Sequence, residues 1–283
     1  MSLGERGLQR VGLVDAYASS RAGGLTAIIQ FVDKTLVIAE LEARKLRHDP
    51  TEVIMRAIQP ALWLLVFGEV FTRTRVIPTG GLSYLDFMAP GILAQSVLFV
   101  AIFYGIAVIW ERDLGIVHKF LASPTPRAAL VLGKALSASL RSLSQMLIIY
   151  ALAWLLGVDL NRNPLALAGV LCVVILGAAL FSTLSLIIAS LVKTRERFMG
   201  IGQVLTMPLF FASNAIYPVA IMPFWLQAVA HANPLTYEVD ALRALMLTDG
   251  VSAFGLGADF SILLLVVAIM VVIGGKLYPR VAT

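Results

Sequence analysis

Three histidines and one cysteine are the side chains of this sequence best suited to catalysis or metal binding. His48, His118 and His231 fall in separate polar stretches, and Cys172 lies inside an apolar run. A catalytic pair or a metal site needs several such groups to converge. The spacing therefore predicts neither. A single cysteine also excludes an intrachain disulfide, and we expect Cys172 to be a buried structural thiol.

The sequence also lacks a recognisable nucleotide site. Gly133-Lys134 is followed by alanine and has no upstream glycine of the kind that a phosphate-cradling P-loop requires. No separate hydrophilic segment is large enough to bind ATP. We therefore expect this chain to bind no cofactor, and any use of ATP would need another chain.

A charged segment at residues 111–127 offers a binding surface rather than a reaction centre. Its first half, Asp113–Ala122, predicts a short amphipathic helix. The apolar residues on one face of that helix are Leu114, Val117, Phe120 and Leu121. Thr125 as N-cap and Pro126 as first residue predict that a new helix begins there. Either a soluble partner grips this segment, or it is an ordinary loop resting on lipid headgroups.

The composition indicates an integral membrane protein. Of 283 residues, 59% are hydrophobic and 14% are charged, with a mean hydropathy of +0.88. A soluble domain has about half apolar and about a quarter charged residues. The net charge of +5 is explained by the membrane, because 17 of the 22 lysines and arginines fall in segments predicted to face the cytoplasm. We therefore expect no nucleic-acid partner.

Apolar segments predict the fold class, an all-α polytopic membrane protein with six transmembrane helices. Each segment approaches the ~20 residues needed to cross a bilayer core. They lie at about residues 54–71, 85–110, 136–156, 165–191, 199–222 and 260–278. The bias of basic residues places both termini in the cytoplasm. Residues 1–32 are predicted to be a cytoplasmic tail, and residues 33–48 a helix at the headgroup boundary.

Residues 223–247 are apolar but cannot form a simple crossing, because they contain charges and two proline breaks. Pro223 can open one short helix, while Asn233 as N-cap and Pro234 as first residue can open another. We expect two short re-entrant helices at the outer face before the last span. Irregular backbone at that depth is tolerated only where protein or water covers it.

Two charged residues within or beside the spans have alternative explanations. Glu69 is either a functional acid in the membrane or one half of an interfacial ion pair with Arg73 or Arg75. Arg141 either binds a substrate or extends its long apolar stem so that the guanidinium reaches the cytoplasmic boundary of the membrane. The sequence favours the structural explanation in both cases.

The most specific motif follows the fifth predicted span. Pro234-Leu235-Thr236-Tyr237, then five residues, then Arg243, resembles the P-L-x-Y-x5-R signature of the permease subunits of ABC-2 type exporters. The Ala89-Pro90-Gly91 step and the segment at 111–127 are also similar to this family. The resemblance covers about residues 40–278 of a transmembrane domain at 33–283. Within the family, the chain looks closest to daunorubicin-resistance and nodulation lipooligosaccharide exporters.

This resemblance implies a function and a set of partners. The chain would be a permease subunit of a prokaryotic inner membrane and not an enzyme. It would pair with a second permease chain, forming a homodimer, and with two copies of an ATPase that binds ATP and magnesium. Residues 111–127 would couple the two proteins through Glu111, Arg112 and Asp113 and the apolar residues named above. The cargo would be a lipophilic drug or a lipid-linked saccharide.

The cargo path is predicted to run between two permeases. It would be lined by Gln59, Gln95, Phe99, Gln203, Phe210 and Asn214. The alternative is that these polar side chains form hydrogen bonds between helices of one subunit.

Two other functions remain to be compared. An ion-coupled carrier without an ATPase expects ionisable residues near the membrane midplane, and the predicted spans contain almost none. An intramembrane enzyme expects convergent catalytic side chains, which the scattered histidines do not supply.

Overall fold

The computed structural model describes residue 55 and residues 58–74, 77–115, 127–192 and 194–278. The packing of the chain separates residues 1–47 from residues 48–283, and every described residue belongs to the second unit. The predicted tail at 1–32, the predicted headgroup helix at 33–48 and most of the loop at 111–127 lie outside the described residues.

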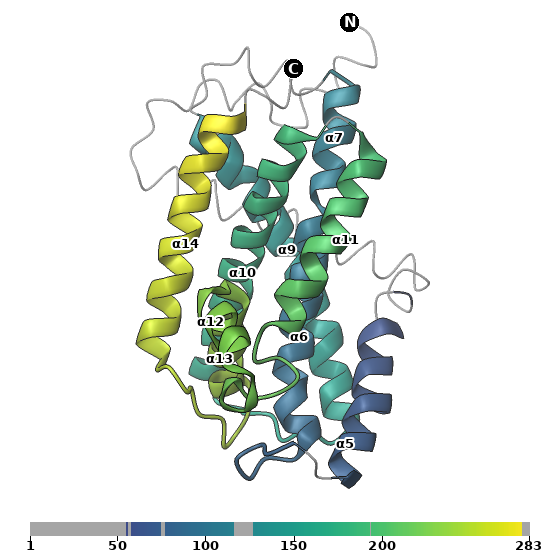
Figure 1. Ribbon diagram of the computed structural model, residues 1–283, viewed down its shortest axis with the longest axis vertical. Coiled ribbons are helices and arrows are strands. Elements are labelled where there is room, and N and C mark those ends of the chain that lie inside the picture. Colours follow the sequence, from purple (N-terminus) through teal and green to yellow (C-terminus); the bar gives the residue numbers. More distant parts are fainter. Residues whose placement is uncertain (1–54, 56–57, 75–76, 116–126, 193, 279–283) are drawn as a thin grey trace, which may run out of the picture. The chain divides into compact units, whose positions relative to one another are not determined.

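Every regular element of the described part is a helix, as the all-α prediction requires (Figure 1). In chain order the elements are η2 (Trp63–Gly68), α5 (Glu69–Thr74), α6 (Tyr84–Phe103), α7 (Gly105–Asp113), α9 (Arg127–Leu155), α10 (Pro164–Leu191), α11 (Arg195–Phe211), η3 (Val219–Ile221), α12 (Phe224–Ala232), α13 (Pro234–Met246) and α14 (Leu256–Leu277).

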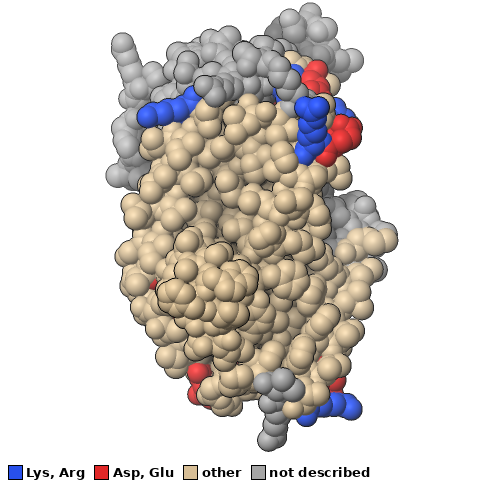
Figure 2. Space-filling model, viewed as in Figure 1, with Lys and Arg blue, Asp and Glu red and all other residues tan. Residues whose placement is uncertain are grey.

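Four helical stretches of the described residues are long and apolar enough to cross a membrane. They are Tyr84–Asp113, Leu130–Leu155, Pro164–Leu191 and Leu256–Leu277. On the face shown in Figure 2, charged side chains gather near the two ends of the helices and leave a nearly uncharged surface between them. These features support a multi-pass membrane protein. The count of six spans stays a prediction.

The fifth predicted span, residues 199–222, is wrong in its second half. Helix α11 ends at Phe211, and residues 212–218 are irregular. Pro208 removes a backbone donor near the end of the helix. Because the helix stops there, Gln203 and Asn214, two of the residues predicted to line a cargo path, lie on different segments. Gln203 is exposed on α11, whereas Asn214 is buried in the irregular stretch.

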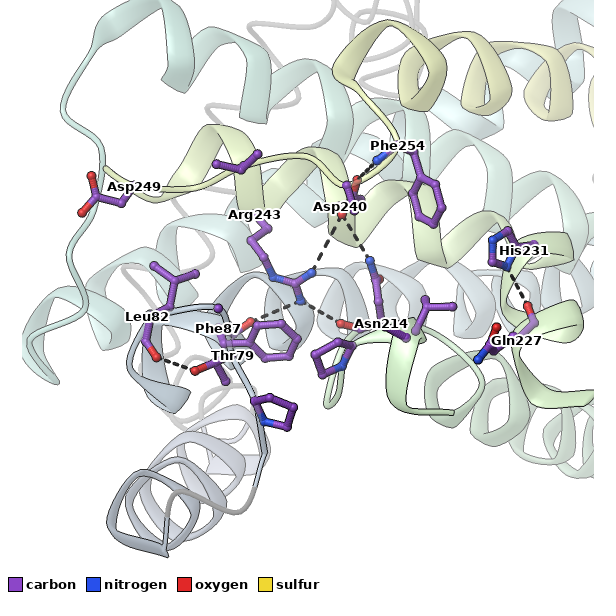
Figure 3. A pocket seen from close by; sticks show the side chains of 18 residues that line it. Thr79, Leu82, Phe87, Asn214, Gln227, His231, Asp240, Arg243, Asp249 and Phe254 are labelled. Carbon is purple, nitrogen blue, oxygen red and sulfur yellow. Dashed lines mark hydrogen bonds and ion pairs between the residues drawn. The ribbon is translucent and has the colours of Figure 1, made fainter. Parts of the chain in front are cut away.

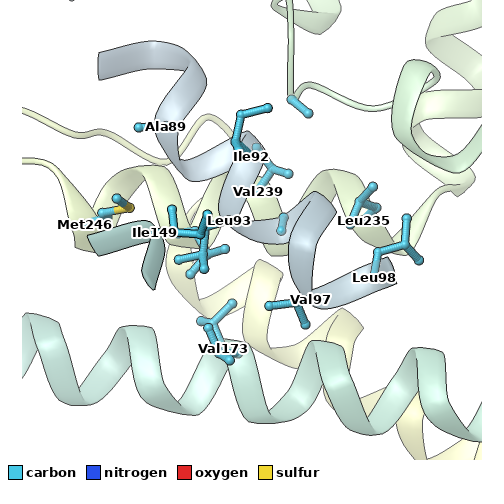
Figure 4. Packing of buried hydrophobic residues seen from close by; sticks show 14 of the residues in the cluster. Ala89, Ile92, Leu93, Val97, Leu98, Ile149, Val173, Leu235, Val239 and Met246 are labelled. Carbon is cyan, nitrogen blue, oxygen red and sulfur yellow. The ribbon is translucent and has the colours of Figure 1, made fainter. Parts of the chain in front are cut away.

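Helix α10 occupies the centre of the bundle, where it packs against α6, α7, α9, α11, α13 and α14. Its small residues make these close approaches possible. Gly177, Ala178, Ser182 and Ser185 are all buried. Figure 4 shows Val173 of this helix among apolar side chains of α6, α9 and α13, including Leu93, Ile149 and Val239.

A short break separates α6 from α7 at Tyr104. The backbone N–H of Gly105 donates to the hydroxyl of Ser185 on α10 at 3.0 Å, and that hydroxyl donates to the carbonyl of Ile102. A side chain at Gly105 would collide with Ser185 and with the ring of Phe198. The break is therefore held by a neighbouring helix, and the missing side chain lets that helix approach.

The two short helices α12 and α13 follow the prolines that predicted them. Asn233 is the N-cap of α13, because its side chain accepts a hydrogen bond from the N–H of Leu235 at 3.0 Å. The same side chain donates to the carbonyls of Leu209 (2.7 Å) and Ala212 (2.9 Å). Asn233 thus satisfies carbonyls that the end of α11 leaves without helical partners.

Three predictions about single side chains can be compared with the structure. Glu69 pairs with Arg73 at 2.8 Å on an exposed surface, which confirms the ion pair. The guanidinium of Arg141 lies 5.5 Å from the ring centre of Tyr104, and both explanations of this arginine stay predictions. Cys172 was expected to be buried, and this prediction is wrong, because the thiol is exposed on the outward face of α10.

The two asparagines that precede a helix-opening proline provide a matched test. Asn163 caps α10 with one hydrogen bond to Leu165, whereas Asn233 also donates to two carbonyls. Asn163→Ala should cost about 1 kcal/mol, as for a lost helix cap. Asn233→Ala should cost about 1–3 kcal/mol more, because it leaves buried carbonyls without donors. Apparent melting temperatures of the purified variants measure the difference, and equal losses would contradict the second role of Asn233.

Candidate functional site

Charged residues at the end of α7 form ion pairs with two other helices. Glu111 pairs with Lys134 of α9. The carboxylate of Asp113 pairs with the guanidinium of Arg195 of α11 at 2.7 Å. Arg112 lies beside Asp113 at 3.3 Å. We call these five residues the inner charged cluster.

Two further contacts attach the inner charged cluster to its surroundings. The guanidinium of Arg112 donates to the carbonyl of Val192, next to the C-terminus of α10, at 3.1 Å. The guanidinium of Arg195 lies 3.8 Å from the ring centre of Trp110, a favourable cation–π geometry. The last turn of α7 is therefore tied to α9, α10 and α11 together.

The predicted coupling segment begins beside this cluster. Helix α7 ends at Asp113, and Leu114 and Gly115 form a turn in which Gly115 has a φ of +70°. The short helix predicted from Asp113 thus does not start at that residue. The side chain of Leu114 is 69% exposed. Val117, Phe120 and Leu121 lie outside the described residues.

The signature residues form a second group at the start of α13 and along it. Pro234 is the first residue of the helix, and Leu235 is completely buried. The hydroxyl of Tyr237 donates to the carbonyl of His231 on α12 at 2.8 Å. The first part of the signature therefore holds the two short helices together.

Arg243 is the buried centre of this second group. Its guanidinium donates to the carbonyls of Asn214 (2.7 Å) and Phe87 (3.3 Å) and lies 3.9 Å from the centre of the Phe87 ring (Figure 3). Asp240, one helical turn earlier, is 4.0 Å from the guanidinium. Arg243 thus connects α13 to α6 and to the irregular stretch after α11.

Asp240 completes this group and was not among the predicted site residues. Its carboxylate accepts hydrogen bonds from the Asn214 amide (3.4 Å), the Ser252 hydroxyl (2.9 Å) and the Phe254 N–H (3.1 Å). Its position three residues before Arg243, on the same face of a helix, was the available signal. We call Phe87, Asn214, Asp240, Arg243 and Ser252 the signature cluster.

A cavity of about 800 Å³ opens beside the signature cluster. Its walls come from the loop at 78–82, from α12 and α13, and from the loop at 249–254 (Figure 3). The volume lies within the range of ordinary ligand pockets. Both aromatic and polar side chains line it, among them Phe254, Gln227, His231 and Asp249.

The residues predicted for a cargo path are divided among several places. Gln59, Gln95 and Phe99 surround a small hollow of about 100 Å³, together with Gln145. Phe210 is buried, and its ring centre lies 5.8 Å from that of Trp63. Asn214 belongs to the signature cluster. Gln203 lies on the exposed face of α11. A single path lined by all six remains a prediction.

Within the described ranges, no three histidine, cysteine, aspartate or glutamate side chains lie close enough together to hold a metal ion.

Removal of the buried guanidinium tests the signature cluster. Arg243→Met leaves the carboxylate of Asp240 without its cation and removes the guanidinium donor from the carbonyls of Asn214 and Phe87. We expect a loss of about 3–5 kcal/mol in the free energy of unfolding. Arg243→Lys retains the charge and should lose less.

Arg162→Met, at an exposed arginine, is the control, with apparent melting temperature and yield in detergent as measurements. If Arg243→Met were as stable as this control, the signature cluster would have no structural role.

Comparisons with known proteins give one consistent result. Residues 34–247 match the ABC-2 type transporter family. The ycf38 transport permease of Cyanophora paradoxa is 29% identical over 219 residues, which are 76% of this chain and 74% of that protein. The daunorubicin resistance ABC transporter permease protein DrrB1 of Streptomyces coeruleorubidus is 27% identical over 200 residues (71% and 70%). Nodulation protein J of Rhizobium leguminosarum bv. trifolii is 28% identical over 191 residues (67% and 71%).

Proposed function

Because the chain belongs to the ABC-2 type transporter family, we propose that it is the permease subunit of an ATP-driven exporter whose ATPase is a separate chain. The match over residues 34–247 carries this proposal, since that range contains the inner charged cluster and the signature-cluster residues Phe87, Asn214, Asp240 and Arg243. The chain is a multi-pass transport protein rather than an enzyme, as its permease relatives also indicate.

The inner charged cluster supports the proposal that the ATPase binds at residues 111–127. Residues 111–127 join α7 to α9, and the cluster ties the first of these helices to α9, α10 and α11. A displacement of this segment would therefore act on several helices at once. We propose that two copies of the ATPase bind two permease chains through residues 111–127, with both permease termini in the cytoplasm and six spans in each chain.

The class of cargo is proposed from the relatives. One relative is a daunorubicin resistance permease and another is a nodulation protein. We propose a lipophilic drug or a lipid-linked saccharide, moved out of the cytoplasm between the two permeases. The glutamines around the small hollow and the cavity beside the signature cluster are two polar surfaces available to it.

Reversing one charge of the Asp113–Arg195 pair tests the coupling. We expect Asp113→Arg to lower vanadate-sensitive ATPase activity of the co-purified complex severalfold, because two positive charges would then face each other. The double variant Asp113→Arg/Arg195→Asp should recover much of that activity. Arg197→Asp, at an exposed neighbour on the same helix, is the matched control and should change little.

Three results would count against this proposal. Unchanged activity in every charge variant would remove the inner charged cluster from the coupling. Failure of every ATPase from the same gene cluster to co-purify with the chain would remove the partner. Accumulation of solute by the chain alone, driven by an ion gradient, would favour the ion-coupled carrier instead.

The cargo is tested in inverted vesicles that contain both subunits. Daunorubicin and a fluorescent lipid-linked oligosaccharide serve as probes. We expect ATP-dependent accumulation of at least one of them, and no accumulation when the ATPase carries a disabled P-loop lysine. If neither accumulates, the proposed cargo classes are wrong.

A further inference from the structure

Glu238 on α13 has a buried carboxyl group that forms no hydrogen bond with the described residues. Its exposed fraction is 0%, and neither carboxyl oxygen receives a hydrogen bond from the described part of the chain. The carboxyl packs against Gly177 of α10. A side chain at Gly177 would collide with it. Helix α10 therefore provides a recess, without a donor, into which this acid fits.

The recess lies far from either end of α10. Gly177 is 13 residues from Pro164, the first residue of α10, which is about 20 Å at 1.5 Å per residue. The neighbouring positions on the two helices are apolar and completely buried. They are Leu235 and Val239 on α13 and Val173, Val174 and Ala178 on α10. The surroundings of Glu238 are therefore those of a hydrocarbon core.

No ionisable side chain on the elements that pack against α13 is bonded to Glu238. The elements with the most contacts to α13 are α6, α10, α12 and α14. On α10 and α14, Cys172 and Lys276 are exposed, and the carboxyl of Asp259 lies 2.9 Å from the hydroxyl of Ser252. On α6 and α12, Tyr84 donates to Ile216, Asp86 accepts from Ser83, and His231 contacts Gln227. On α13 itself, Tyr237 donates to His231, and Asp240 and Arg243 belong to the signature cluster.

An ionised carboxylate in such surroundings would lose its hydration and gain no partner, so the neutral acid is much more stable there. We propose that Glu238 and the recess at Gly177 form a proton-binding site, in which a bound proton allows α13 to pack against α10.

The proton-binding site has a consequence for the cavity beside the signature cluster. Helices α12 and α13 supply one wall of that cavity, including Gln227, His231 and Arg243. Release of the proton would require either that water reach Glu238 or that α13 move away from α10. By the second route, proton occupancy would control the position of that wall.

Infrared spectroscopy of the full chain in lipid nanodiscs tests the protonation state directly. A protonated carboxylic acid has a C=O stretching band that is separate from those of a carboxylate and an amide. We expect this band in the wild-type protein at pH 7 and its loss in Glu238→Gln. A difference spectrum in which Glu238 contributes only carboxylate bands would overturn the proposal.

The pH dependence of stability provides a second test. The folded protein holds the proton up to a higher pH than the unfolded chain does, so the stabilisation from the site is complete at low pH and is lost as pH rises. Apparent melting temperatures of wild type and Glu238→Gln should therefore be similar at pH 5. At pH 8 the variant should melt several degrees higher.

Glu196→Gln, at an exposed acid on α11, is the control and should follow the wild type at both pH values. Parallel pH profiles for wild type and Glu238→Gln would overturn the proposal. So would failure of the neutral Glu238→Gln chain to accumulate in the membrane, because the proposal requires that a neutral side chain of this shape be accepted.

Gly177→Ala tests the recess itself. The added methyl group would displace the carboxyl, so we expect the protonated-acid band to shift or disappear and the melting temperature to fall. Gly200→Ala is the control, because nothing lies near the added methyl at that position. If the band and the melting temperature were unchanged in Gly177→Ala, the carboxyl of Glu238 would not occupy the recess at Gly177, and the proposed site would be overturned.

Discussion

A peptide group or charge removed from water must find a partner within the protein, and this requirement explains how the irregular half of the bundle is built. Helix α11 stops inside the bundle, which leaves carbonyl groups without helical partners. The amide of Asn233 donates to two carbonyls of that region, and the guanidinium of Arg243 donates to the carbonyl of Asn214. The short helices α12 and α13 are thus part of the solution to an interrupted crossing.

The two ends of the helices use charge in different ways. The ion pair between Asp113 and Arg195 is more than a third exposed on both sides, so each such contact contributes little alone. Several weak contacts can separate and re-form at small cost, which suits a surface that receives a moving partner. Arg243 is instead buried among fixed carbonyls and an aromatic ring. Its replacement would disturb several elements at once.

Much of the helical organisation was predictable, because it depends on local patterns. Apolar length located α10 and α14, and the proline after Asn233 located the start of α13. The end of α11 was predicted incorrectly because the apolar sequence continues past Phe211, whereas the helix ends there. The state of Cys172 could not be predicted either, since a buried and a lipid-facing position have the same apolar neighbours in sequence.

The candidate site was predictable only in part, for a similar reason. The signature identified Arg243, but its partners Phe87 and Asn214 come from distant segments that only the fold brings together. Gln59 and Gln95 do meet around one hollow, whereas Gln203 is exposed although Phe210, seven residues further along the same helix, is buried. Spacing along one helix specifies a face, but not what the face contacts.

The interruption at Tyr104 gives the inner end of the second span a mechanical property. Helix α7 has nine residues and is a rigid rod of about 13 Å. It meets α6 at the point where the hydroxyl of Ser185 accepts a hydrogen bond from the N–H of Gly105. The far tip of this rod is attached to α9 and α11 by the Glu111–Lys134 and Asp113–Arg195 pairs. The rod then resembles a lever whose fulcrum is a single serine of α10, so a small swing at its base would become a larger displacement of the two helices attached to its tip.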